Sequence, residues 1–330
     1  MAVTGMMEPT PLAGIRYVTP PEGTFLSARD GRATVACGGL PIPLRDDDAI
    51  ALHPGAIPSY DAVGEGIYQA LRLNPGCAFA DRYATLLRDA YPHLVADLAS
   101  QLLMLERKDV EVPYLDRLIT ALRIFLLMEP DNPRFLLQIG RIYREKGLRL
   151  SALNQATRSL YLAQGYLSRA RTLLPADPEL LLLLGDVSWL LGKYDEARNC
   201  FQGAREVGVG ERSAELEERL VRLESGAQPL VPAVDYLEAI GVALELHQRQ
   251  EYAEAAAILW DVLEDEVFRE ECPLPELNYL LGRCYEALAM PRYAEECYAE
   301  ALAKRPDYEE AREALRELGE DVRCQGGFPQ

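Results

Sequence analysis

One short unit constrains the fold of this chain more than any other feature. It spans 178–204 and reads PELLLLLGDVSWLLGKYDEARNCFQGA. With Pro178 as position 1, small residues fall at positions 8, 20 and 27, which are Gly185, Ala197 and Ala204. Small side chains at this spacing let two antiparallel helices approach closely, while bulky residues at positions 4, 7 and 24 fill the space between them. The unit therefore predicts a pair of packed helices.

The same spacing recurs elsewhere in the chain. A nearly complete copy begins at Pro275, and another begins at Pro133. A fourth and weaker unit begins near Tyr236, where Ala243 takes the position of the glycine. Self-similarity of this kind indicates stacked helix pairs, each of which contacts only its neighbours.

These units resemble the tetratricopeptide repeat, a helix–turn–helix of roughly 34 residues. The resemblance covers 133–208 and 236–314 well and identifies no subfamily. It implies an all-α fold, a right-handed superhelical solenoid of antiparallel helix pairs. To this fold the chain adds a small irregular or β-hairpin segment at its N-terminus.

The unit that begins at Pro133 departs from the pattern in its second helix. Ala163, Leu167 and Ala170 match positions 20, 24 and 27 only if eleven residues are inserted before them. Eleven residues make about three helical turns. We therefore expect one helix lengthened by three turns, with a separate extra helix as the alternative.

The N-terminal part of the chain differs from the rest because it is rich in proline and glycine. Its β-like runs, TFLSA and ATVACGGLPIPL, predict a hairpin or an extended strap. The next stretch, 59–76, carries Tyr60, Val63 and Ile67 on one apolar helical face and matches the second half of a repeat whose first half is missing. We expect the leader to fold back and cover that face.

Composition and periodicity set the remaining organisation. Leucine-rich helical segments precede the repeats, and a stretch with glycine and two prolines interrupts them. Two charged helices suit the ends of repeat stacks, because terminal units need a polar outer face. We therefore expect two stacked modules joined by a short hinge. The expected parts are a leader at 1–58, degenerate helical repeats at 59–132, repeats with a charged cap helix at 133–226, a linker at 227–235 and C-terminal repeats with a second cap helix at 236–330.

Several classes of protein are disfavoured by motifs that the sequence lacks. No stretch has the length or apolarity of a membrane span, and the start lacks the regions of a secretory signal. The seven cysteines are an odd number without metal-ligand spacing, so we expect a cytoplasmic protein with no metal and no cofactor. No phosphate-binding loop or catalytic motif is present. Cys37 and His53 lack a group to orient them as nucleophile and base, so we expect no enzyme.

Charge is distributed unevenly along the chain. The net charge of −18 argues against a nucleic-acid partner. Residues 132–176 nevertheless hold 8 basic residues and 1 acidic residue, a net of 8 − 1 = +7. Residues 235–321 hold 8 basic and 23 acidic residues, a net of 8 − 23 = −15. A reversal of sign this local favours a functional surface over an ordinary solvated face.

The resemblance also indicates where a ligand would bind. In tetratricopeptide proteins the groove is lined by the first helix of each repeat, chiefly at positions 2, 5, 9 and 12. In this sequence those positions place three arginines at one end of a surface that also offers a tryptophan and a tyrosine, which suits a partner segment with acidic and apolar residues. Alternatively, the tryptophan packs between repeats and the arginines are solvated. The candidate partner-binding residues are Arg134, Leu137, Arg141, Arg144, Asp186, Trp189, His247, Tyr279 and Arg283.

Two functions follow from these patterns. The first is a non-catalytic adaptor or chaperone that holds a segment of a protein partner in the groove. The alternative is a structural scaffold that self-associates through its basic surface, 132–176, and its acidic surface, 235–321. The clamp with which some tetratricopeptide domains bind a terminal carboxylate needs lysine at position 5 and asparagine at position 9. Leu137 and Arg141 hold those positions in the first unit, so this clamp is absent.

Overall fold

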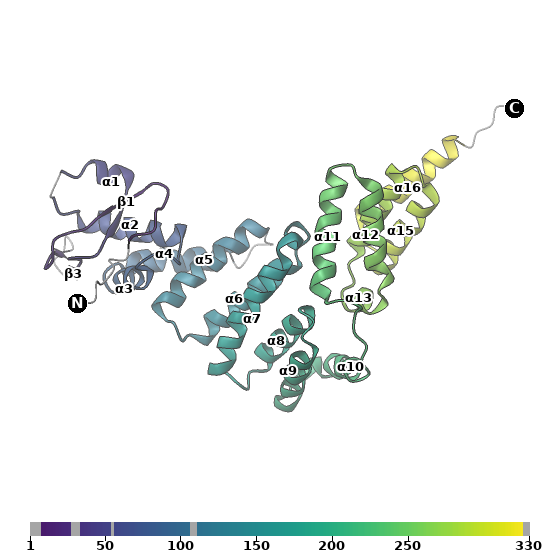
Figure 1. The fold of residues 1–330 in the computed structure, drawn as a ribbon, viewed down its shortest axis with the longest axis horizontal. Coiled ribbons are helices and arrows are strands. Elements are labelled where there is room, and N and C mark those ends of the chain that lie inside the picture. The colour runs from purple at the N-terminus through teal and green to yellow at the C-terminus, as the bar shows by residue number, and fades with distance from the viewer. Residues whose placement is uncertain (1–7, 28–33, 54–55, 106–110, 326–330) are drawn as a thin grey trace, which may run out of the picture. The chain divides into compact units, whose positions relative to one another are not determined.

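The computed structural model describes residues 8–27, 34–53, 56–105 and 111–325. The parts of the leader at 1–7, 28–33 and 54–55, like the segments 106–110 and 326–330, lie outside the described residues. The chain divides into two compact units, 1–142 and 143–330 (Figure 1). Antiparallel helix pairs dominate the described residues and a small β segment opens the first unit, so the predicted fold class is confirmed. No helix in these ranges is long and apolar enough to cross a membrane.

The first unit begins with two small antiparallel sheets. Strand β2 (Phe25–Ser27) pairs with β3 (Thr34–Ala36), which confirms the hairpin expected from TFLSA and ATVACGGLPIPL. Strand β1 (Ile15–Val18), which the sequence pattern did not indicate, pairs with β4 (Ile42–Arg45). A short helix, α1 (Asp46–Ile50), follows directly after β4.

The leader covers the apolar face of α2 (Tyr60–Leu73), as predicted. Ile67 of this helix is fully buried, and Leu44 of β4 belongs to the same core cluster. A Cβ on Gly66 would overlap the backbone carbonyl of Pro43, so only glycine permits this approach of strand to helix. The described part of the leader is therefore ordered against the helix whose repeat partner is missing.

Three further helices of the first unit, α3, α4 and α5, match the expected leucine-rich segments. Helix α3 packs against both α2 and α5. Helices α2, α3 and α5 therefore share one hydrophobic core. The bounds are Ala80–Ala90 for α3, Pro92–Leu105 for α4 and Val112–Met128 for α5.

The inserted residues of the next repeat take a form that was only partly expected. After α6 (Pro133–Leu148) comes a six-residue 3-10 helix, η1 (Leu150–Gln155), and then α7 (Ala156–Leu173). Helix α7 has 18 residues, whereas α9 (Tyr194–Val207) has 14, a difference of about one turn. The three-turn lengthening is therefore wrong, and the alternative of an extra helix applies in the form of η1.

The 3-10 helix η1 contacts a helix that lies far from it in the sequence. Helix α11 (Ala233–Gln248) packs on η1 and on α7. A Cβ on Gly241 would lie 2.8 Å from the backbone nitrogen of Asn154, so the two backbones nearly touch. The Glu238 carboxylate accepts a hydrogen bond from the backbone N–H of Thr157 at 3.1 Å, in the first turn of α7. The insertion thus supplies the surface that receives the C-terminal repeats.

The repeat positions behave as the spacing predicts. Gly185 of α8 (Pro178–Leu190) faces the ring of Phe201 in α9, because a Cβ there would overlap the ring. Gly282 meets the ring of Tyr298 in the same way in the last repeat. One helix of the second unit, α13, was not predicted. The other bounds in this unit are η2 Gly210–Arg212, α10 Ser213–Glu224, α12 Tyr252–Glu264, α13 Glu266–Glu271, α14 Pro275–Ala287, α15 Pro291–Lys304 and α16 Glu309–Gln325.

The predicted linker at 227–235 lies within the second unit rather than at the boundary between the two units. Part of it is held in place, because the backbone N–H of Leu230 donates a 2.7 Å hydrogen bond to the buried carboxylate of Asp265. The division of the repeats into two modules at this linker stays a prediction.

Candidate partner-binding pocket

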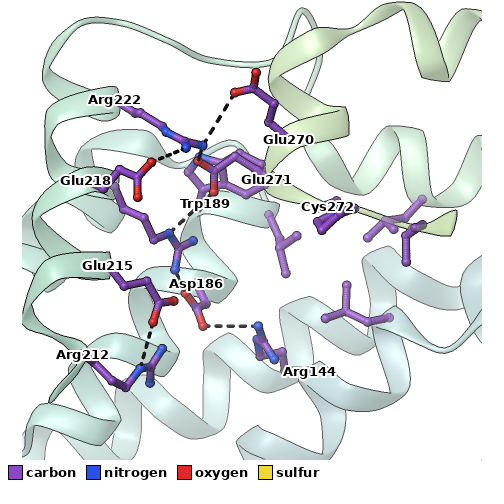
Figure 2. Close-up of a pocket in the computed structure, with 16 residues that line it drawn as sticks. Arg144, Asp186, Trp189, Arg212, Glu215, Glu218, Arg222, Glu270, Glu271 and Cys272 are labelled. Atoms are coloured by element: carbon purple, nitrogen blue, oxygen red, sulfur yellow. Dashed lines mark hydrogen bonds and ion pairs between the residues drawn. The ribbon is translucent and has the colours of Figure 1, made fainter. Parts of the chain in front are cut away.

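A pocket of about 480 Å³ opens in the second unit beside Trp189, and we refer to it as the Trp189 pocket (Figure 2). Its walls come from the C-terminal part of α6, from α8, η2, α10 and α11, and from α13 with the segment that joins it to α14. The residues that line it are Arg144, Leu148, Asp186, Trp189, Leu190, Arg212, Glu215, Glu218, Arg219, Arg222, Leu237, Glu270, Glu271, Cys272, Pro273 and Leu274.

The apolar part of the pocket is built from first-helix positions of two repeats. Trp189 and Leu190 of α8 and Leu237 of α11 are all buried. The Trp189 ring makes an edge contact with the ring of Tyr194, at 6.4 Å between centroids. Trp189 therefore packs within its own repeat and also lines the pocket.

The polar part of the pocket is a network of ion pairs. Asp186 pairs with Arg144 at 3.3 Å, between Oδ2 and Nη2, and also with Arg219. The Arg219 side chain reaches Glu271 at 3.7 Å, and its guanidinium lies 4.7 Å from the centre of the Phe201 ring. The side chains of Asp186 and Glu271 are only 13% and 11% exposed. Charges this far from water need such partners, because burying an unpaired charge is costly.

Arg222 connects α10 to α13 across the pocket. Its guanidinium donates to Glu271 at 2.8 Å and to Glu218, one turn earlier on α10, at 2.7 Å. Glu270 lies 3.9 Å from the same guanidinium. Figure 2 shows the three acids arranged around Arg222, with Glu270 and Glu271 approaching from α13.

Two arginines of the pocket keep capacity for further contacts. Arg212 pairs with Glu215 at 3.4 Å, and both side chains are exposed. Arg144 is one-third exposed, although its Nε is buried and has no hydrogen-bond partner among the described residues. A guanidinium carries five N–H donors, so the single contact with Asp186 leaves Arg144 only partly satisfied.

Neither Cys37, which was considered as a nucleophile, nor Cys272 of the pocket is activated. The pKa of Cys272 in the pocket is raised to about 12. Burial is the largest cause, and the nearby Glu271 carboxylate is the second. Burial also raises the pKa of Cys37, whose thiol is fully buried and donates to the backbone carbonyl of Thr24 at 3.6 Å. Both thiols are protonated near neutral pH and are poor nucleophiles, which agrees with a packing role for Cys37.

The structure brings together only part of the predicted set. Arg144, Asp186 and Trp189 meet in the Trp189 pocket. The remaining members lie elsewhere. Arg134, Leu137 and Arg141 lie on the part of α6 that belongs to the first unit, and His247, Tyr279 and Arg283 lie in the C-terminal repeats.

The three C-terminal residues form a half-buried group of their own. The Tyr279 ring lies 5.8 Å from the ring of Tyr298 between centroids, and Arg283 pairs with Glu286 at 3.5 Å. Burial and the charge of Arg283 lower the pKa of His247, so this histidine is neutral near pH 7. A neutral histidine and a paired arginine add little positive charge to the groove.

Sequence reasoning missed the arginines of α10. Arg219 and Arg222 belong to the charged helix that was interpreted as a cap, yet they contribute most of the ion pairs in the pocket. Their spacing of three residues places both on one helical face, and this was the available signal. Glu271 carried no signal, because nothing in the repeat pattern indicated α13.

Stacked antiparallel helix pairs with small residues at their contacts define a helical-repeat protein of the solenoid class. Residues 178–204 match the tetratricopeptide repeat family, and a comparison with curated proteins finds no match. The same helix-pair geometry recurs in the last repeat, so the chain contains tetratricopeptide-like repeats and matches no particular subfamily. Tetratricopeptide repeats generally bind protein partners.

Several solved structures are similar to the chain. The P58(IPK) TPR domain is 18% identical with a TM-score of 0.32, over 68% of this chain and 56% of that one. The chain therefore spans little more than half of that structure. MamA is 16% identical with a TM-score of 0.29, over 64% of this chain and 94% of that one. YrrB, a TPR protein with an unusual peptide-binding site, is 15% identical with a TM-score of 0.24, over 59% of this chain and 98% of that one.

Proposed function

We propose that this protein is a non-catalytic adaptor that holds a segment of a partner protein in the Trp189 pocket. One observation supports the proposal. A single pocket of about 480 Å³ is lined both by buried apolar side chains and by a cluster of partly buried arginines. An apolar side chain of the partner would enter beside Trp189, and acidic side chains would bind the arginines.

The balance of buried charge favours an acidic ligand. Asp186 is shared by Arg144 and Arg219, and Glu271 is shared by Arg219 and Arg222. The two well-buried carboxylates thus form ion pairs with three arginines. The side chains of Glu218 and Glu270 are more exposed, so their charges are better screened. A carboxylate brought by the partner would bind these arginines through charge-assisted hydrogen bonds, which are the stronger kind.

The test uses the position of the two tryptophans. Trp189 is 4% exposed and lines the pocket, whereas Trp260 is 49% exposed on α12. In a Trp260→Phe background Trp189 is the sole tryptophan, so its fluorescence reports on the pocket. The probes are peptides selected from a random library on the immobilised protein. We expect the selected peptides to be rich in acidic and apolar residues and to change the Trp189 emission saturably.

Variants that reverse the charge of a pocket arginine show whether the peptides bind at this site. Arg212→Glu and Arg144→Glu are each expected to weaken binding roughly tenfold or more, about 1.4 kcal/mol. Arg292→Glu is the matched control, because Arg292 is exposed on α15 and lies outside the pocket. Circular dichroism checks that each variant is folded. Equal affinity in the Arg212 and Arg292 variants, or peptides that leave Trp189 emission unchanged, would refute the proposed site.

We also propose that the adaptor works in the reducing environment of the cytoplasm. The six cysteines whose side chains the structure describes are free, and disulfides persist mainly in oxidising compartments. Fractionation of cells that express the chain tests this placement, and recovery of the protein outside the cytoplasmic fraction would contradict it.

A further inference from the structure

The segment between α12 and α14 is longer than the repeat pattern requires. Helix α15 passes to α16 through only residues 305–308, whereas α12 ends at Glu264 and α14 begins at Pro275. The extra residues form α13 and carry Glu270–Leu274 to the edge of the Trp189 pocket. An insertion that ends in a pocket needs an explanation beyond chain connection.

The acidic half of this segment occupies the arginines of the pocket. Glu271 is 2.8 Å from Arg222 and 3.7 Å from Arg219, and its side chain is nearly buried. Glu270 is more exposed and lies 3.9 Å from Arg222. The acids of α13 thus hold the positions that the carboxylates of a bound partner would need.

The second half of the segment is apolar. Cys272, Pro273 and Leu274 follow the acids directly, and all three line the pocket. The thiol of Cys272 is protonated near neutral pH, so it counts as a small apolar group. The segment therefore combines two acids with a short apolar run, which is the chemistry proposed for the partner.

We propose that Glu270–Leu274 is an internal surrogate for the partner segment. The proposal rests on the proposed function and specifies it further: the partner carries two consecutive acidic residues followed within three positions by proline and a leucine-like side chain. The partner binds by displacing Glu271 from Arg219 and Arg222. An internal competitor acts at high effective concentration, so the free protein binds such segments weakly.

The way α13 is anchored allows this exchange without unfolding. Asp265 caps α13 by accepting a 3.0 Å hydrogen bond from the backbone N–H of Phe268, and the Phe268 side chain is buried. These contacts lie before Glu270 in the chain and do not involve the arginines. The surrogate can therefore leave the pocket while the first turn of α13 stays in place.

The experiment compares binding with and without the charges of the surrogate. The probe is a fluorescein-labelled peptide EVFREESPLPE, which is 266–276 of this chain with serine in place of the cysteine. In the full-length protein, Glu270→Gln with Glu271→Gln is expected to tighten binding of this peptide by about tenfold or more, measured by fluorescence anisotropy. A peptide with two lysines in place of the adjacent glutamates is expected not to bind.

The matched control removes the same charge elsewhere. Glu295 and Glu296 are also consecutive, and both are exposed on α15. Changing both to glutamine alters the net charge by the same amount as the surrogate variant. This control therefore measures how much the affinity for an acidic peptide rises from weaker charge repulsion alone. Affinity of the surrogate variant within about twofold of this control would overturn the proposal.

The outcomes separate this proposal from the proposed function. If the surrogate variant gains nothing but Arg222→Glu abolishes binding, the pocket binds acidic segments and the internal surrogate is wrong. If no variant binds the peptide, the surrogate is also wrong, and the proposed function is judged by the library peptides and Trp189 emission. Tighter binding in the surrogate variant that Arg222→Glu abolishes is the result we expect.

Discussion

At the scale of single residues, one carboxylate organises three parts of the second unit. Asp265 accepts hydrogen bonds from the backbone N–H of Leu230 at 2.7 Å, from the hydroxyl of Tyr236 at 2.9 Å and from the backbone N–H of Phe268 at 3.0 Å. Burial alone would raise the pKa of Asp265, but the hydrogen bonds from Phe268, Leu230 and Tyr236 outweigh it, and the pKa lies below its ordinary value.

This arrangement predicts a pH dependence of stability. Because the folded-state pKa is depressed, Asp265 stabilises the fold above the unfolded-state value of about 3.9 and loses that contribution as the pH falls toward the lower folded-state value. Asp265→Asn is expected to lower the free energy of unfolding by about 1–3 kcal/mol at pH 7 and to flatten its dependence on pH below about 4. Urea denaturation at several pH values measures both effects.

The control for this prediction is Asp261→Asn on the exposed face of α12. It removes one carboxylate of the same type, four residues earlier, and is expected to change the free energy of unfolding by less than about 0.5 kcal/mol. Equal effects of the two substitutions would mean that the hydrogen bonds of Asp265 contribute nothing specific.

At the scale of elements, the contact between η1 and α11 decides how the repeats are joined. Gly241 permits it, because its missing Cβ leaves room for the backbone of Asn154. Glu245 adds a 3.4 Å hydrogen bond from the Asn154 side chain at the same contact. The two elements are about ninety residues apart in the chain, and no repeat position specifies their meeting.

Two glycine substitutions test this contact. Gly241→Ala gains helix propensity but forces η1 and α11 apart, so we expect a net loss of about 1–3 kcal/mol in the free energy of unfolding. Gly165→Ala in α7 is the matched change, because a Cβ there meets nothing within 4 Å. It is expected to stabilise the protein by up to about 1 kcal/mol. Thermal denaturation followed by circular dichroism measures both, and stabilisation by Gly241→Ala would contradict the close contact.

At the scale of the whole molecule, the uneven charge raises the question of self-association. Most basic residues of 132–176 already have partners within the chain, which weakens the case for assembly through this surface. The engaged residues are Arg141, Arg144, Lys146, Arg149, Arg169 and Arg171. The scaffold alternative therefore stays a prediction with less support than the adaptor.

Sedimentation decides between these alternatives. We expect the same molecular mass, that of a monomer, at about 50 mM and about 500 mM salt, because most basic residues of 132–176 already make contacts within the chain. Growth of the mass at low salt, reversed at high salt, would favour the scaffold.

Local spacing was sufficient to predict the helix pairs. Gly185 meets Phe201 and Gly282 meets Tyr298, as the repeat positions require, and the leader covers α2 as its unpartnered apolar face indicated. The prediction held because each of these contacts joins residues close in sequence or satisfies an apolar face that would otherwise be exposed. Arg144, Asp186 and Trp189 also reached one pocket, since they occupy first-helix groove positions of two adjacent repeats, position 12 for Arg144 and Trp189 and position 9 for Asp186.

The sequence by itself therefore determined the repeat architecture and the residues of its helix contacts, because these depend on spacing within about 34 residues. Only the tertiary structure decided that η1 receives α11, that α10 faces the pocket and that Glu271 meets Arg219 and Arg222. These contacts join distant segments, and the chain offers 34 basic and 52 acidic residues as possible partners. Charge alone does not select one pair among so many, so their choice depends on where packing of the apolar faces places each helix.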